Sequence, residues 1–257
     1  MRRKNKERLL VSCIFFNLLM VLFVNCDIKY NKNILVVSKP HVVLGEKKKV
    51  AKENLDNLKM DKPFKMDEKI DRKLDRIIVV DPGHGGVDKG TNIGNLYEKN
   101  INLAIASYTK SYLQQNGFKV YMTREEDKLI PLKEIGNFVN DIRPEVFVSI
   151  HVNSFKENKY EGISTYYYDP NGFQREERIE LAKSIQKQNI KDGIWHDRGI
   201  LRQNIAVLRY SNSNCVLVEC GFITNEGDRK KLQDESILKS TGENIAKGII
   251  NYINNKN

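Results

Sequence analysis

Short apolar runs rich in β-branched residues alternate with longer helix-like segments from residue 76 onward, and this alternation restricts the fold more than any other feature of the sequence. The expected strands cover residues 77–81, 119–123, 146–152, 162–168 and 215–220, and the expected helices cover residues 98–115, 131–142, 174–190 and 236–253. Apolar runs of strand length are typical of strands buried on both faces of a sheet. The alternation therefore predicts an α/β domain of three layers, with a mostly parallel central sheet flanked by helices.

The first 75 residues differ in composition and are expected to lie outside this domain. A basic start, MRRKNKER, precedes an apolar run over residues 9–24, which is the pattern of an export signal. The run is shorter than the roughly 20 residues of a full membrane span. A removed signal peptide and a retained membrane anchor both remain open for residues 1–26, and so does lipidation of Cys26. Residues 27–75 are rich in lysine and predict a flexible basic tether, which leaves residues 76–257 as the folded domain.

The net charge of +10 is concentrated near the N-terminus. Residues 1–76 hold 19 lysines and arginines against 10 aspartates and glutamates, whereas residues 77–257 hold 24 against 23. The folded domain is therefore nearly neutral, and its charge does not favour nucleic acid as a partner. Because positive charge precedes the apolar run, we expect the domain to be exported, with the N-terminal segment contacting the membrane.

Two cysteines of the domain, Cys215 and Cys220, lie on one expected strand. Five residues of strand span about 16 Å, which exceeds the limit of about 7 Å between the Cα atoms of a disulfide. Their odd spacing also places them on opposite faces of the sheet. We therefore expect two free and buried thiols.

Three residues with metal-binding side chains occur at the ends of successive elements. His84 follows the first strand in the glycine-rich sequence DPGHGG, Glu98 opens the next helix, and His151 lies near the end of the third strand. Open α/β sheets place their sites at the carboxyl ends of the strands. Taken singly, His84 can be explained as a histidine in a turn, and Glu98 by its favourable interaction with the helix dipole. Together, two imidazoles and one carboxylate are the donor set of a catalytic zinc ion, which keeps a fourth position for water.

Glu219 is a carboxylate inside the otherwise apolar strand VLVECGF. An unpaired buried carboxylate is costly and has a raised pKa, which suits a group that transfers protons. The alternative is a structural ion pair between Glu219 and a nearby lysine or arginine.

Four motifs in this order resemble the zinc-dependent N-acetylmuramoyl-L-alanine amidases of the Amidase_3 family. They are DPGHGG (81–86), the helix that begins at Glu98, SIHVNS (149–154) and VLVECGFITN (216–225), and the resemblance covers about residues 77–255. It implies hydrolysis of the amide between the lactyl group of N-acetylmuramic acid and L-alanine in peptidoglycan. It also implies that His84, Glu98 and His151 bind one Zn²⁺ per chain, and that Glu219 is the catalytic glutamate.

Within the family, the chain is similar to the germination-specific, spore-cortex type. It has a bare catalytic domain over residues 76–257, a short N-terminal signal or anchor, and no wall-binding repeats. Only one helix, over residues 174–190, is expected between Ser154 and Glu219, which argues against a helix that plugs the site. The subgroup implies cortex maturation through muramic-lactam formation in the forespore intermembrane space, with an accessory lipoprotein as a partner. A zinc peptidase acting on stem peptides and a catalytically silent wall-binding protein are the alternatives.

Polar residues near these motifs are expected to have simpler roles. Asp81 is a candidate to orient the imidazole of His84 through a hydrogen bond. Arg124 is expected to cap a strand or to pair with the acidic residues that follow it. His196 is expected to be a surface histidine, and Asn153 a turn residue after a strand.

Overall fold

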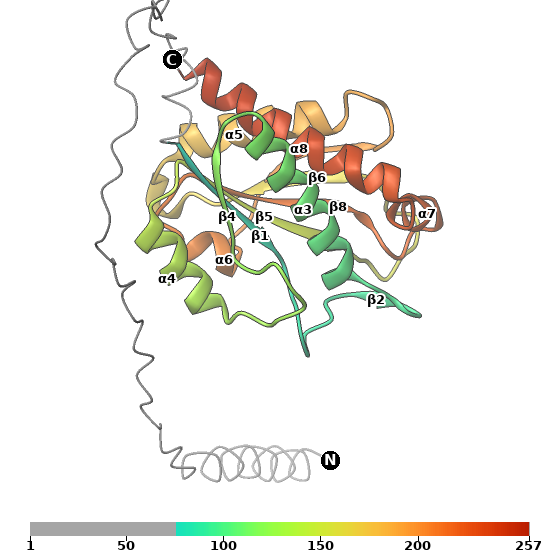
Figure 1. The fold of residues 1–257 in the computed structure, drawn as a ribbon. Coiled ribbons are helices and arrows are strands. Elements are labelled where there is room, and N and C mark those ends of the chain that lie inside the picture. Colours follow the sequence, from blue (N-terminus) through green and yellow to red (C-terminus); the bar gives the residue numbers. More distant parts are fainter. Residues whose placement is uncertain (1–75, 257) are drawn as a thin grey trace, which may run out of the picture. The chain divides into compact units, whose positions relative to one another are not determined.

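A six-stranded sheet lies at the centre of residues 76–256, the part of the chain that the computed structural model describes (Figure 1). In spatial order the strands are β4 (Lys119–Met122), β1 (Ile77–Pro82), β5 (Val146–Asn153), β8 (Cys215–Phe222), β6 (Ile163–Tyr167) and β7 (Asp197–Arg202). The first four run parallel, whereas β6 is antiparallel to β8, and β7 is parallel to β6. The expected mostly parallel sheet is confirmed, and the reversed direction of β6 and β7 makes it mixed.

Helices cover both faces of this sheet, which completes the three layers (Figure 1). On one face lie α3 (Glu98–Gln115), α5 (Arg175–Asn189) and α8 (Glu235–Asn255). On the other face lie α4 (Leu132–Ile142) and α6 (Ala206–Arg209). The short α7 (Glu226–Leu232) follows β8 and precedes α8.

The apolar strands have two buried faces, which explains why their sequences do not alternate between apolar and polar residues. In β1, Ile78 and Val80 belong to the larger core under α3, α5 and α8, whereas Val79 belongs to the smaller core under α4 and α6. Cys220 likewise belongs to the larger core, and Cys215 belongs to the smaller one. Both cysteines are buried and free, as the spacing predicted.

The elements that the sequence analysis missed are short or polar. They are the hairpin of β2 (Asn92–Ile93) and β3 (Leu96–Tyr97), the 3₁₀ turn η1 (Pro170–Gly172), and β7, α6 and α7. The four residues of α6 are too few to show helical periodicity. The expectation of a single helix between Ser154 and Glu219 is therefore wrong, because α6 follows α5 in that segment.

Several expectations concern parts of the chain outside the described residues. These are the signal or anchor over residues 1–26, the tether over residues 27–75, and the contact of the N-terminal segment with the membrane. Within residues 76–256, no helix combines the length and the hydrophobicity that crossing a membrane requires.

Candidate metal centre and active site

The three side chains expected to bind a metal meet at one edge of the sheet. His84 follows β1 in a loop, Glu98 is the first residue of α3, and His151 lies on β5. One nitrogen or oxygen atom from each residue lies within 4.8 Å of those of the other two. Glu98 Oε1 is 3.2 Å from His84 Nε2 and 3.0 Å from His151 Nδ1. Segments that are distant in the sequence thus place three donor atoms around one point.

The spacing of these atoms fits a small divalent ion. Ligands about 2.0–2.1 Å from a tetrahedral zinc ion lie about 3.3 Å from one another. The two separations at Glu98 Oε1 are close to this value. Two imidazoles and one carboxylate also match the donors of catalytic zinc sites, in which a fourth position stays open.

Backbone amides hold the carboxylate of Glu98 in place. Glu98 Oε1 accepts a hydrogen bond from the N–H of Val152 at 3.0 Å, and Oε2 accepts one from the N–H of Thr91 at 2.8 Å. Glu98 is buried, and only 5% of its side chain is exposed. These contacts fix both oxygens against the strand and the loop that carry the histidines, which is the kind of support that orients metal ligands.

The charges of the cluster depend on one another. Burial alone would raise the pKa of Glu98, but hydrogen bonds with His151 and His84 outweigh it and hold this pKa well below its ordinary value. Burial alone would lower the pKa of His84, but Glu98 and Asp88 raise it to about 9. The pKa of His151 is also raised, because the hydrogen bond with Glu98 and the charges of Glu219 and Glu98 together outweigh burial. A metal ion bound here would therefore compete with protons on the imidazoles.

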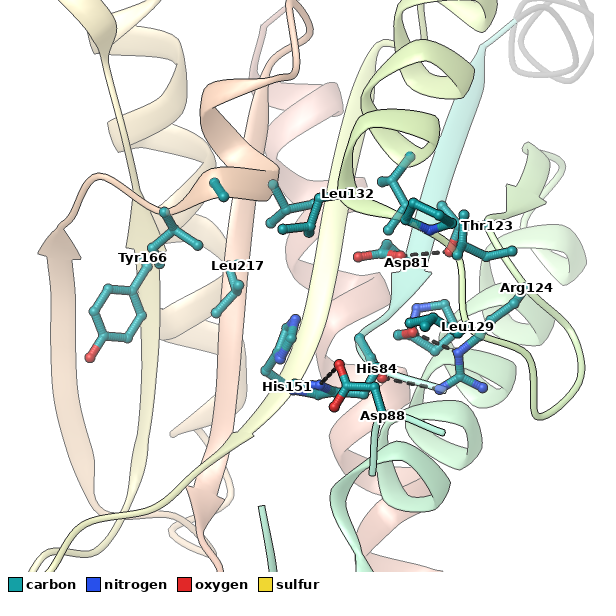
Figure 2. Close-up of a pocket in the computed structure, with 18 of the residues that line it drawn as sticks. Asp81, His84, Asp88, Thr123, Arg124, Leu129, Leu132, His151, Tyr166 and Leu217 are labelled. Carbon is teal, nitrogen blue, oxygen red and sulfur yellow. Dashed lines mark hydrogen bonds and ion pairs between the residues drawn. The ribbon is translucent and has the colours of Figure 1, made fainter. Parts of the chain in front are cut away.

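Asp88, rather than Asp81, orients His84. His84 Nδ1 lies 2.8 Å from Asp88 Oδ2, which leaves Nε2 facing Glu98, and Figure 2 shows Asp88 beside the ring. Asp81 instead accepts hydrogen bonds from the hydroxyls of Thr123 and Ser149, each at 2.6 Å. The prediction for Asp81 is wrong. The spacing of four residues between His84 and Asp88 within one loop is the signal that could have pointed to Asp88.

The backbone of His84 is in a left-handed conformation, with φ of +62°. A non-glycine residue in this region costs about 1–3 kcal/mol, and such a residue persists only where its surroundings determine the conformation. Arg124 supplies part of these surroundings, because it donates to the carbonyls of Pro82 and Gly83. Of the two roles expected for Arg124, capping a strand is confirmed, because it donates to the carbonyl of Pro82 at the end of β1. It forms no ion pair with the acidic side chains that follow it, and its hydrogen bond there is to the carbonyl oxygen of Glu126.

Two glycines allow the cluster to close. A Cβ atom on Gly83 would lie 2.2 Å from His151 Nε2. A Cβ atom on Gly90, which has φ of +63°, would lie 2.4 Å from Glu98 Oε2. Any larger side chain at either position would displace a member of the cluster.

Glu219 lies beside the cluster on β8, where it pairs in register with His151. Burial raises the pKa of Glu219 to about 7. Its Oε2 atom is buried and accepts no hydrogen bond from the described residues. Within residues 76–256, no lysine or arginine forms an ion pair with it, so the structural alternative for Glu219 has no support.

His84, His151 and Glu219 line a cavity of about 530 Å³ (Figure 2). Its other walls are largely apolar. They come from the segment before α4, from α4 and α6, and from the sheet, and include Leu129, Ile130, Pro131, Leu132, Ile135, Tyr166, Ile205, Ala206, Val207 and Leu217. Asn153 is the last residue of β5 rather than a turn residue after the strand, so that expectation is wrong, and Asn153 lines the cavity. His196 is exposed, as expected, and does not line it.

The fold and the site together define an α/β enzyme whose cavity holds a cluster suited to one metal ion beside an unpaired carboxylate. Residues 78–251 match the family of N-acetylmuramoyl-L-alanine amidases, Amidase_3, and the chain belongs to this family. It is accordingly an amidase that acts on peptidoglycan. The resemblance drawn from the four sequence motifs is confirmed. Family membership favours this activity over the peptidase and the silent wall-binding protein.

Relatives and solved structures agree with this assignment. The chain is 33% identical over 177 residues to the uncharacterized protein YqiI of Bacillus subtilis, covering 69% of this chain and 84% of that protein. It is 29% identical over 198 residues to the germination-specific N-acetylmuramoyl-L-alanine amidase of B. subtilis, covering 70% of this chain and 81% of that protein. An amidase from Clostridium difficile 630 superposes with a TM-score of 0.66 at 35% identity, and the match covers 71% of this chain and 98% of that chain. The CwlD amidase from Clostridioides difficile, solved in complex with the GerS lipoprotein, superposes with a TM-score of 0.63 at 31% identity. The match covers 70% of this chain and 98% of that chain.

Proposed function

We propose that the chain is a zinc-dependent amidase in which His84, Glu98 and His151 hold one Zn²⁺ and Glu219 is the catalytic base. The bond cleaved is the amide between the lactyl group of N-acetylmuramic acid and L-alanine of the stem peptide. The observation that carries this proposal is the cluster in which Glu98 Oε1 lies 3.0–3.2 Å from a nitrogen of each histidine, with the unpaired carboxylate of Glu219 next to it.

The chain's own residues perform the proton transfers in this proposal. When bound, zinc supplies Lewis-acid polarisation of the scissile carbonyl and lowers the pKa of a water molecule. Glu219, with a pKa of about 7, accepts the proton that this water loses when it attacks the carbonyl carbon. Glu219 then delivers this proton to the nitrogen of L-alanine as the C–N bond breaks. Asp88 accepts the Nδ1 proton of His84, which fixes the imidazole so that its Nε2 lone pair faces the centre.

Analysis of muropeptides by mass spectrometry tests the reaction. We expect the purified chain with zinc to release a stem peptide that begins with a free L-alanine, and to leave muramic acid with an intact lactyl group. Cleavage within the stem peptide would contradict the proposal and support the peptidase alternative.

The proposed setting is the spore cortex, where the enzyme would prepare muramic acid for lactam formation. Support comes from the similarity to the germination-specific amidase of B. subtilis and to the CwlD structure. The proposal includes export to the outer face of the cytoplasmic membrane or the forespore intermembrane space, and a lipoprotein as accessory partner. Cells that lack the protein should build cortex without muramic lactam. A normal lactam content would contradict the cortex role and leave the amidase reaction intact.

We expect Gly90→Ala to weaken zinc binding by at least about 10-fold, the lower end of the range for residues that support metal ligands. The added Cβ would lie 2.4 Å from Glu98 Oε2. Gly94→Ala is the matched control, because Gly94 has φ of +58° and nothing lies within 4 Å of its added Cβ. Isothermal titration with zinc measures both variants. Equal affinity in the two variants would contradict the proposed position of the ion.

The stability of the metal-free protein should fall as the pH rises from about 6.5 to about 9. The pKa of His84 is raised from 6.5 to about 9 in the folded state, so protonation of His84 stabilises the fold. This stabilisation is complete below pH 6.5 and is lost as the pH rises to about 9. Thermal unfolding in the presence of a chelator measures the trend. His84→Gln, which has no titrating imidazole, should show a weaker dependence. A dependence as steep in this variant as in the natural chain would contradict the assignment.

We also expect a chain that begins at Arg76 to fold without residues 1–75. The described sheet begins at Ile77, and the two described cores consist of residues from 78 onward. Such a chain should unfold cooperatively and cleave the same bond. Aggregation or a broad transition would contradict a domain boundary at residue 76.

A further inference from the structure

Arg124 is a buried arginine whose hydrogen bonds all go to backbone carbonyls. It lies just after β4 and is 4% exposed. Nε donates to the carbonyl oxygen of Pro82 at 2.9 Å, and Nη1 donates to that of Glu126 at 3.1 Å. Nη2 donates to the carbonyls of Gly83 at 3.1 Å and Lys99 at 2.8 Å. It forms no ion pair with any carboxylate of residues 76–256, although the charges of Asp81 and Asp127 favour its protonated form from a greater distance.

These carbonyls belong to the two segments that carry two of the proposed metal ligands. Pro82 and Gly83 immediately precede His84, and Lys99 immediately follows Glu98. One guanidinium therefore connects the histidine loop to the first turn of α3. Figure 2 shows Arg124 at the edge of the cavity with its hydrogen bonds to this loop.

A second set of contacts attaches the same loop to the same helix. Asp127 Oδ1 accepts the N–H of Gly86 at 2.7 Å. Lys99 Nζ donates to the carbonyl of Gly86 at 2.8 Å and lies 2.6 Å from Asp127 Oδ2. The loop between Pro82 and Gly86 is therefore held on both sides of His84, whose left-handed backbone requires such support.

We propose that Arg124 is a positioning residue for the metal centre, because it fixes the separation between His84 and Glu98 before a metal ion binds. The inference rests on the proposed zinc site. The planar guanidinium presents its N–H donors in a fixed geometry and can join several carbonyls at once, whereas the single ammonium of lysine cannot keep the same directions. Arg124 thereby determines how tightly the site binds zinc, although it contacts neither the ion nor the reacting atoms.

Two substitutions in the full-length chain test this role. Arg124→Gln removes the charge and most of the donors, and we expect the dissociation constant for zinc to rise by about 10–100-fold, the range seen for residues that orient metal ligands. Arg124→Lys retains the charge and should give an intermediate rise. Competition with a chromophoric chelator measures zinc affinity. At saturating zinc, KM for muropeptides should remain close to that of the natural chain in both variants, because Arg124 acts on the metal ligands.

Arg178→Gln is a matched control. Arg178 lies on α5, is fully buried, and donates to the carbonyls of Tyr168, Ser211 and Ser213, none of which adjoins a metal ligand. We expect this variant to lower the unfolding temperature and to bind zinc with unchanged affinity below that temperature. A general loss of stability is thereby separated from a loss of metal-site geometry.

The outcomes distinguish this proposal from the proposed function. Zinc affinity in folded Arg124→Gln equal to that of the natural chain, or an equal loss in Arg178→Gln, would overturn the positioning role and leave the zinc site standing. If Arg124→Gln does not fold, the zinc affinity of Arg124→Lys is measured instead. An affinity equal to that of the natural chain would then overturn the positioning role of Arg124. A natural chain that binds no zinc at all would instead contradict the proposed function itself.

Discussion

Glu219→Gln should retain one zinc per chain and should lower kcat for muropeptide cleavage by about 10²–10⁴-fold, the usual contribution of a general acid or base. Glutamine has nearly the same size and shape as glutamate, but it does not accept a proton at neutral pH. Its amide can occupy the buried position of Oε2 without removing any ion pair, because none of the described residues pairs with Glu219 there. Metal analysis and steady-state kinetics on the same sample measure the two effects separately.

Glu226→Gln is the matched control for this substitution. Glu226 is exposed at the start of α7, where it pairs with Lys230. Its replacement should leave kcat, KM and zinc content unchanged. If Glu219→Gln cleaved peptidoglycan as fast as the natural chain, Glu219 would not be the base. If it lost zinc together with activity, Glu219 would have to be considered a ligand.

His84→Ala and His151→Ala should each lose bound zinc, and activity with it. Each substitution removes one of three donor atoms, so the affinity should fall by more than about 100-fold, the upper end of the range for residues that only support ligands. The stabilisation by zinc should disappear as well. For the natural chain this stabilisation is about 2.7 kcal/mol when free zinc is at 100 times its dissociation constant. Differential scanning calorimetry with and without zinc measures it.

His196→Ala provides the control for the histidine variants. His196 is exposed and lies outside the cavity, so its replacement should change neither zinc content nor the thermal shift. Full zinc occupancy in either His84→Ala or His151→Ala would show that the metal is held elsewhere on the chain.

Local patterns along the chain predicted the main elements and the candidate ligands. The helix from Glu98 to Gln115 was expected with its observed bounds, because apolar spacing defines its length and Asn116-Gly117 follows its end. The three ligand candidates were predictable because each lies at or near the end of a regular element. In a sheet whose neighbouring strands run parallel, such ends meet at one edge.

Features that depend on contacts between distant segments could not be predicted in this way. Asp81 does not orient His84 because it accepts hydrogen bonds from Thr123 and Ser149, which lie 42 and 68 positions away in the sequence. The role of Arg124 depends on carbonyls of segments about 25 and 42 positions away in the sequence. The antiparallel direction of β6 follows from its pairing with β8, and a strand sequence alone does not specify direction.

Anomalous diffraction at the zinc absorption edge, recorded from crystals of the zinc-loaded protein, shows whether His84, Glu98 and His151 surround one ion. We expect one strong peak per chain within about 2.0–2.2 Å of a ligand atom of each of His84, Glu98 and His151. A peak at cysteine sulfur or at exposed side chains would contradict this expectation, and so would three side chains that surround no ion although zinc is present in excess.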